Sequence, residues 1–181
     1  SITIERYQAP QQEEIIEESP QNNTIIDINN ETKFVLQKFN VSCPEILTDA
    51  SNKNIILVDH STYTQSINGM KSANIIEMLD HHNLGDVKSQ SPLQIKTYPI
   101  GSTATIVYTC YLENNISIDE QNAGLLLSAI MSDTANLTSD TTTEVDKKAV
   151  EYLSKVAKVN DLDSYNKELD KKRVIEKMIQ N

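Results

Sequence analysis

The chain alternates between continuous apolar runs and segments whose apolar residues recur every three or four positions. Two runs, NIILVDH from Asn54 and NIIEMLD over 74–80, are typical of strands that are buried on both faces of a parallel sheet. QIKTYPI over 94–100 is rich in Ile, Thr and Tyr and predicts a third strand. Residues 65–72 are expected to form a short crossover between the first two strands.

Helical spacing occurs before and after these strands. The expected helices are ETKFVLQKF after a cap at Asn30, GSTATIVYTCYL from Gly101 to about Leu112, a helix at 118–131 opened by a capping box of Ser117 and Glu120, and a helix after Thr141 with Val145, Ala149, Leu153 and Val156 on one face. The stretch AGLLLSAIM is apolar nearly all round, which indicates a central helix. Strands that alternate with helices predict an α/β fold with a mainly parallel sheet flanked by helices.

The polar segments at the two ends set the expected domain limits. Residues 1–23 are rich in Gln, Glu, Asn and Pro and predict a disordered arm. Residues 24–166 are expected to form the α/β domain. Residues 167–181 are expected to be a charged helical tail or the start of an interdomain linker, with little apolar surface to bury.

Composition narrows the classes of partner. A net charge of -10 disfavours nucleic acid, because binding to its phosphate backbone relies on lysine and arginine. No apolar run approaches the roughly 20 residues that a membrane span needs. Cys43 and Cys110 do not form a CxxC pair, and no secretory signal is apparent, so both are expected to be reduced thiols in a cytoplasmic protein.

Acidic and imidazole side chains follow the first two predicted strands. Asp59 ends the first, and Asp80, His81 and His82 end the second. Ligands of open parallel sheets collect at the carboxyl ends of the strands, so these side chains are expected to converge. Asp133, which ends the predicted buried helix, joins them only if that helix points back to the same edge.

Carboxylates combined with imidazoles suit a divalent transition metal such as manganese, zinc or iron. Two such ions about 4 Å apart can stabilise phosphate oxygens and lower the pKa of a water molecule. Each residue also has a simpler explanation, because an Asp after a strand is often a turn or cap residue and a loop histidine is often idle. The segment Gly101–Thr105 is equally compatible with a plain helix start and with a phosphate cradle.

Five linked motifs follow one another along the chain: INNETKFVLQKFNVSCPEIL, NIILVDHSTYTQSI, IIEMLDHHNLGDV, PIGSTATIVY and AGLLLSAIMSDTANLTSDTTTEVDKKAVEYL. Together they resemble the manganese-dependent (family II) inorganic pyrophosphatases of the DHH phosphoesterase superfamily. The resemblance covers roughly residues 25–166, and the separations of Asp59 from His81 and of His81 from Asp133 match the family without gaps.

The resemblance implies a role for each matching residue. Asp59 and Asp133 correspond to carboxylate ligands shared by two Mn²⁺ ions, with Mg²⁺ or Co²⁺ as other ions that such a site accepts. His81 corresponds to a ligand of the second metal, and His82 to a contact with the substrate phosphate. In such enzymes a metal-bridging hydroxide attacks pyrophosphate and yields two orthophosphates. A homodimer through a sheet edge is also compatible with this fold.

The chain also departs from the family pattern. Nothing in it matches the opening motif His-x-Asn-Pro-Asp-x-Asp or the basic second domain, and Ser61, Asn83 and Thr138 replace a usual Asn, a basic residue and a frequent Lys. We therefore expect little activity from this chain alone, as a fragment, a truncated product or a degenerate paralogue. The alternatives are a non-catalytic interaction protein and another DHH phosphoesterase, such as an exopolyphosphatase or a nuclease for short oligonucleotides.

Overall fold

A parallel sheet forms one end of the molecule. The computed structural model describes residues 28–179, so the arm expected at 1–23 lies outside the described residues. The sheet has three strands in the order β1-β2-β3, namely β1 (Asn54–Val58), β2 (Asn74–Asp80) and β3 (Gln94–Thr97). Each strand begins where its apolar run begins. The third ends earlier than predicted because Pro99 lacks the backbone N–H that a further ladder bond needs.

The strand register brings the three carboxyl ends to one edge of the sheet. Val58 lies opposite Leu79 and Asp80 lies opposite Thr97, and both strand pairs are parallel. Two short 3₁₀ turns, η1 (Tyr63–Gln65) and η2 (Met70–Ser72), make the expected crossover between β1 and β2. The loops that follow β1 and β2 therefore leave the sheet side by side.

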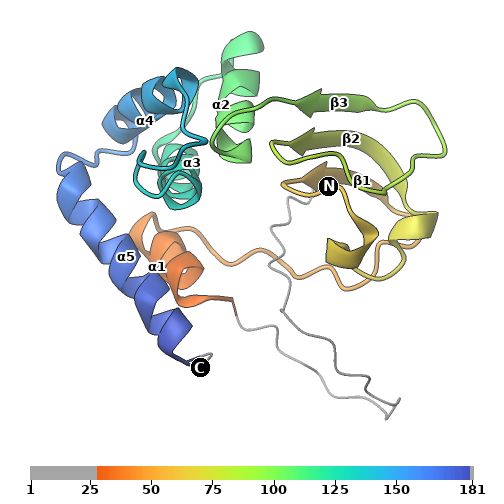
Figure 1. Ribbon diagram of the computed structural model, residues 1–181, viewed down its shortest axis with the longest axis horizontal. Coiled ribbons are helices and arrows are strands. Elements are labelled where there is room, and N and C mark those ends of the chain that lie inside the picture. The colour runs from red at the N-terminus through yellow and green to blue at the C-terminus, as the bar shows by residue number, and fades with distance from the viewer. Residues whose placement is uncertain (1–27, 180–181) are drawn as a thin grey trace.

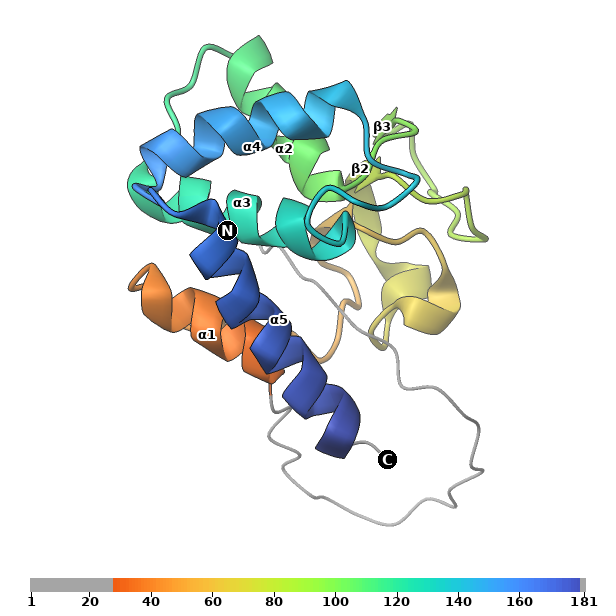
Figure 2. The same cartoon turned by 60° about the vertical axis from the view of Figure 1, so that its left-hand side comes forward.

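Five helices complete the described part of the chain. They are α1 (Asn30–Lys38), α2 (Thr103–Glu113), α3 (Glu120–Asp133), α4 (Glu144–Val156) and α5 (Leu162–Ile179). In Figure 1, α2 lies between the sheet and the group formed by α1, α3, α4 and α5. Figure 2 shows α4 lying along α3, and α1 beside α5. The arrangement confirms the predicted α/β fold with helices flanking a parallel sheet.

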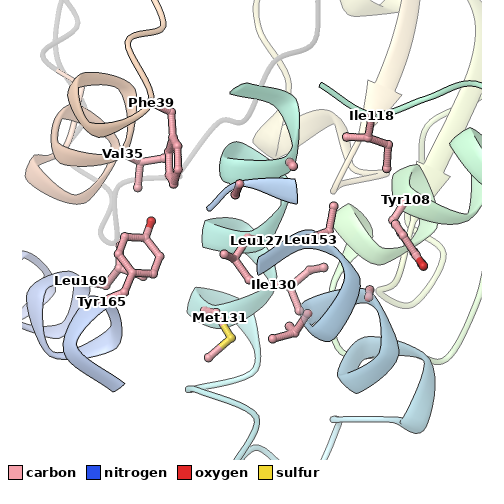
Figure 3. Close-up of a cluster of buried hydrophobic side chains, with 14 residues drawn as sticks. Val35, Phe39, Tyr108, Ile118, Leu127, Ile130, Met131, Leu153, Tyr165 and Leu169 are labelled. Carbon is pink, nitrogen blue, oxygen red and sulfur yellow. The ribbon is translucent and has the colours of Figure 1, made fainter. Parts of the chain in front are cut away.

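The core consists of two apolar clusters, one among the helices and one at the sheet. The larger one surrounds α3, whose Leu127, Ile130 and Met131 point into the space between α1, α4 and α5 in Figure 3. Gly124 admits the ring of Phe39 there, because a Cβ atom at Gly124 would lie 2.2 Å from Phe39 Cδ1. The smaller cluster joins the sheet to its crossover. The predicted central position of the apolar helix is confirmed.

The structure corrects the predicted helix starts. The Asn29 side chain, and not that of Asn30, caps α1 by accepting a hydrogen bond from Thr32 N over 2.7 Å. Asp119 caps α3 in place of Ser117, since its carboxylate accepts from the backbone N–H of Asn122. In both cases the capping side chain lies three residues before the N–H that it satisfies, which is the usual geometry of a helix start.

Two predictions about burial were also wrong. Val145 was expected on the inner face of α4 but is 41% exposed, while Asp146 is buried because α2 offers it hydrogen-bond donors. The C-terminal stretch was expected to bury little, yet Leu169 is fully buried in the core around α3. Arg173 adds an ion pair with Glu31 of α1. The helix α5 runs without a break past residue 166 and is packed against α1.

The described residues add two facts about environment. None of the helices between residues 28 and 179 combines the length and apolar character of a membrane-spanning segment. Cys43 is exposed and Cys110 is half-buried, and both are free thiols.

Candidate metal and phosphate site

The backbone turns sharply at Asp59, directly after β1. Its φ angle is 72°, in the left-handed region where non-glycine residues are uncommon and aspartate is tolerated better than most. The Asp59 N–H still donates to Leu79 O over 2.9 Å, so the residue stays attached to β2 while its side chain leaves the strand direction. Such backbone outliers concentrate at functional sites, where the surrounding structure holds them.

His81 is oriented by the chain that follows β3. Its Nδ1 lies 2.9 Å from the carbonyl oxygen of Ile100. A carbonyl can only accept, so Nδ1 carries a hydrogen and Nε2 is the nitrogen left for a ligand. Nε2 lies 3.6 Å from Asp59 Oδ1. A backbone carbonyl that fixes one nitrogen while the other faces a carboxylate is the usual setting of a metal-binding histidine.

His82 lies against His81. Their ring centroids are 4.1 Å apart and the ring planes are inclined by 70°. Asp59, His81 and His82 each offer a ligand atom, and these atoms lie within 4.8 Å of one another. The predicted convergence of the first two strand ends is therefore present in the structure. The donor set of one carboxylate and two imidazoles fits a divalent transition metal such as manganese.

Asp133 approaches the same region through a hydrogen bond. Its Oδ2 accepts from Ser102 Oγ over 2.6 Å, and the same hydroxyl accepts from Ala104 N to cap α2. Ile100, two residues before Ser102, is the residue that binds His81. Asp133 was expected to join the site only if its helix pointed back to the same edge of the sheet. The helix α3 does end beside the segment that orients His81. Asp133 does not belong to the group of three ligand atoms within 4.8 Å.

Hydrogen bonds to Asp146 hold the chain between Ile100 and the start of α2. This fully buried carboxylate accepts from Gly101 N over 2.9 Å and from Thr105 Oγ1 over 2.6 Å. It also accepts from the N–H and the hydroxyl of Thr143, the residue that caps α4. Burial acts to raise the pKa of Asp146, but the hydrogen bonds from Thr105, Thr143 and Gly101 outweigh it, so the pKa lies below its usual value.

Gly101 leaves no room for a side chain at this position. An added Cβ would lie 2.6 Å from Thr134 Cγ2 and 2.9 Å from Asp146 Oδ2. The segment Gly101–Thr105 contains the predicted helix start and ties α2 to α3 and α4. Its link to the site is the Ile100 carbonyl that His81 binds.

The loops after β1 and β2 are bound to each other. Gly85 N donates to Ser61 Oγ over 2.8 Å, and Val87 N donates to Ser61 O over 3.1 Å. Tyr63 N donates to Asp86 Oδ1 over 2.9 Å. Ser61, one of the residues that depart from the family pattern, therefore has a structural function in this chain. These bonds fix the loop that contains His81 and His82 relative to Asp59.

His60 lies outside the ligand group. Its Nδ1 is 3.3 Å from Val58 O and its Nε2 is 3.1 Å from Ser66 Oγ, so both ring nitrogens face protein partners.

Sequence reasoning missed two acidic residues. Asp146 was hidden in the expected apolar face of α4, although Thr143 and Asp146 have capping-box spacing, and both bonds of that box are present. Asp80 was noted only as the start of the triplet with His81 and His82. Its position two residues before His82 is the spacing of a local Asx bond, which the structure contains.

Comparisons with known proteins show which family the chain is similar to. The family model described as "DHH family, N-terminal domain" matches residues 3–130. The chain is 41% identical over 139 residues to a protein of Archaeoglobus fulgidus named a probable manganese-dependent inorganic pyrophosphatase. It is 42% identical over 130 residues to the manganese-dependent inorganic pyrophosphatase of Methanothrix thermoacetophila. These alignments cover 77% and 72% of this chain but only 43% and 42% of the two relatives.

A solved structure shares the fold. It is the crystal structure of a Methanococcus jannaschii protein assigned as a family II inorganic pyrophosphatase, with a TM-score of 0.76 and 38% sequence identity. The match covers 81% of this chain and 50% of that chain, so this chain spans about half the length of the proteins it resembles. Because the family model matches well over half of the 181 residues, the chain belongs to the DHH family.

Proposed function

We propose that this chain takes part in the manganese-dependent hydrolysis of inorganic pyrophosphate to two orthophosphates. The observation that carries the proposal is the convergence of Asp59, His81 and His82 within 4.8 Å at the carboxyl edge of a parallel sheet. The relatives named as manganese-dependent inorganic pyrophosphatases support the choice of metal and substrate. The alignments cover less than half of these relatives, so the activity of the whole proteins comes to this chain as a proposal.

In this proposal Asp59, His81 and Asp133 hold the metal and His82 contacts the substrate phosphate. His81 presents Nε2 because its Nδ1 is bound to the Ile100 carbonyl. Ser102 keeps Asp133 beside that carbonyl through their 2.6 Å hydrogen bond. When bound, a divalent ion supplies positive charge for the phosphate oxygens and lowers the pKa of a water molecule. The residues of the chain orient the ligands and keep their lone pairs available.

We also propose the substrate class, a homodimer and a location in the cytoplasm. The proposed substrate is a small phosphoanhydride because the relatives are named inorganic pyrophosphatases. The described residues leave β1 and β3 at the edges of the sheet, either of which could pair in the proposed homodimer. The cytoplasm is proposed because the two thiols, Cys43 and Cys110, are free.

Metal binding by the chain itself is the first test. Mn²⁺ is titrated into the wild-type chain and into His81→Ala and Asp59→Asn variants, with His60→Ala as the control because His60 lies outside the ligand group. Saturable binding should be weakened at least about tenfold in the two ligand variants, which is about 1.4 kcal/mol per tenfold step, and kept in His60→Ala. Phosphate release from pyrophosphate, polyphosphate and a dinucleotide then compares the substrate classes. Equal Mn²⁺ binding by all four proteins would contradict the metal assignment.

A further inference from the structure

A buried carboxylate holds the exposed imidazole of His82. Asp80, the last residue of β2, is 1% exposed, whereas the His82 side chain is 56% exposed. Asp80 Oδ1 accepts from both the backbone N–H of His82, over 3.1 Å, and its ring Nδ1, over 2.9 Å. Among the residues that the structure describes, Asp80 Oδ2 has no hydrogen-bond partner.

This arrangement is costly for folding. Burial removes the Asp80 carboxylate from water, and an oxygen without a partner is not compensated for that loss. The bond to His82 returns little stability, because a side chain that is 56% exposed could bind water instead. An apolar residue at position 80 would avoid this loss of folding free energy. We therefore expect that Asp80 serves to orient His82 and does not stabilise the core.

The benefit for His82 is a fixed ring. Two bonds to one oxygen set both the backbone and the ring position, so the exposed side chain does not sample its other rotamers. A carboxylate accepts hydrogen bonds, so Nδ1 carries a hydrogen and Nε2 is the ring nitrogen that Asp80 leaves for a ligand. His81 reaches the same state through the Ile100 carbonyl. The two adjacent histidines are thus oriented by two different acceptors.

We propose that Asp80 is a positioning residue that holds the Nδ1–H of His82 and so leaves Nε2 as the ring nitrogen that contacts the substrate phosphate, to whose oxygens it donates when it also carries a hydrogen. The identity of that ligand rests on the proposed function. The position of the hydrogen on His82 Nδ1 does not depend on the proposed function, because it follows from the contacts of Asp80 within this chain.

The test compares two substitutions of similar size at position 80. In Asp80→Asn the side-chain oxygen can still accept both bonds, since both go to Oδ1 in the wild type. In Asp80→Leu no acceptor remains, and the uncompensated carboxylate is removed as well. The metal-free full chain is labelled with ¹⁵N, and two-bond correlations of the imidazoles are recorded at a pH where neutral rings dominate.

We expect the Nδ1–H pattern for His82 in the wild type and in Asp80→Asn. In Asp80→Leu the Nε2–H pattern should replace it. Urea unfolding of Asp80→Leu should occur at the wild-type midpoint or above it, which a merely structural role of Asp80 does not allow. Asp140→Ala removes an exposed carboxylate from the loop before α4 and should leave the His82 pattern unchanged. If the leucine variant does not fold, Asp80→Ala takes its place.

Either of two results would overturn the proposal: an Nε2–H pattern for His82 in the wild type, or an unchanged Nδ1–H pattern after the acceptor is removed. Absence of Mn²⁺ binding together with the expected ring patterns would count against the proposed function and leave the role of Asp80 intact.

Discussion

Replacing Asp146 by alanine should cost a large part of the stability of this chain. The carboxylate is fully buried and accepts four hydrogen bonds, from Gly101 N, Thr105 Oγ1, and the N–H and hydroxyl of Thr143. Thr143 lies at a helix start and can turn toward water, but the Gly101 and Thr105 donors are buried. Two buried bonds to a charged acceptor, each worth about 1.5 kcal/mol or more, give a loss of at least about 3 kcal/mol. At about 2–4 °C per kcal/mol, the melting temperature should fall by at least about 6 °C.

The pH dependence separates the charge of Asp146 from its shape. Its pKa is lower in the folded protein than the usual 3.8, so its contribution is complete above pH 3.8 and is lost as the pH falls below that value. Asp146→Asn keeps one acceptor oxygen but cannot ionise. Its stability should therefore lie between the wild type and Asp146→Ala at pH 7, and the gap to the wild type should narrow below pH 3.8.

Urea unfolding followed by circular dichroism at several pH values measures both effects. Asp140→Ala is the matched control, because Asp140 is an exposed carboxylate on the loop before α4 and should change stability by less than about 0.5 kcal/mol. The reasoning would be refuted if Asp146→Ala lost less than about 1 kcal/mol, or if the stability gap between Asp146→Asn and the wild type did not change with pH.

Two further predictions concern the helical core. Gly124→Ala should cost about 1–3 kcal/mol, because the added methyl group would lie 2.2 Å from the Phe39 ring; Phe39→Leu in the same chain should recover part of that loss in a thermal unfolding cycle. Burial raises the pKa of Tyr165 to about 12, so the stability it contributes is complete below pH 10.0 and is lost as the pH rises through about 12. Tyr165→Phe should flatten that alkaline loss, and an unchanged alkaline unfolding curve would contradict the assignment.

Where apolar residues are continuous, the sequence predicted the fold well. The runs at 54–58 and 74–80 are strands of a parallel sheet, as their continuous apolar residues predicted. The expected burial on both faces was wrong, because Ile76 is 45% exposed and Leu57 is the one buried residue of β1. The rule that parallel strands share their carboxyl edge then predicted that Asp59 and His81 meet, and they lie 3.6 Å apart. That prediction needed only strand direction and order.

Features that depend on contacts between distant segments could not be predicted in this way. Asp146 is buried because Gly101 and Thr105, more than 40 residues earlier, supply donors to it. Leu169 is buried because α5 packs against α1, which a local pattern rich in Lys and Glu does not reveal. The position of Asp133 likewise depends on a hydroxyl of α2. In each case a tertiary partner decides between two local alternatives.

The turn after Asp133 also limits how the chain can be modified. Ala135, Asn136 and Leu137 have φ angles of 47°, 59° and 64°, three left-handed residues in succession. Thr134 holds this turn, since its backbone oxygen accepts from Thr138 and Ser139 and its hydroxyl accepts from Leu137 N.

Most surface loops accept inserted residues. An insertion in this turn would break several hydrogen bonds to Thr134, which lies directly beside Asp133. The segment from Ser89 to Ser91 in the loop between β2 and β3 is different, because its two serines bond to each other and Ser91 is exposed. A spectroscopic label or an affinity tag is therefore better placed near Ser89 than in the turn between α3 and α4.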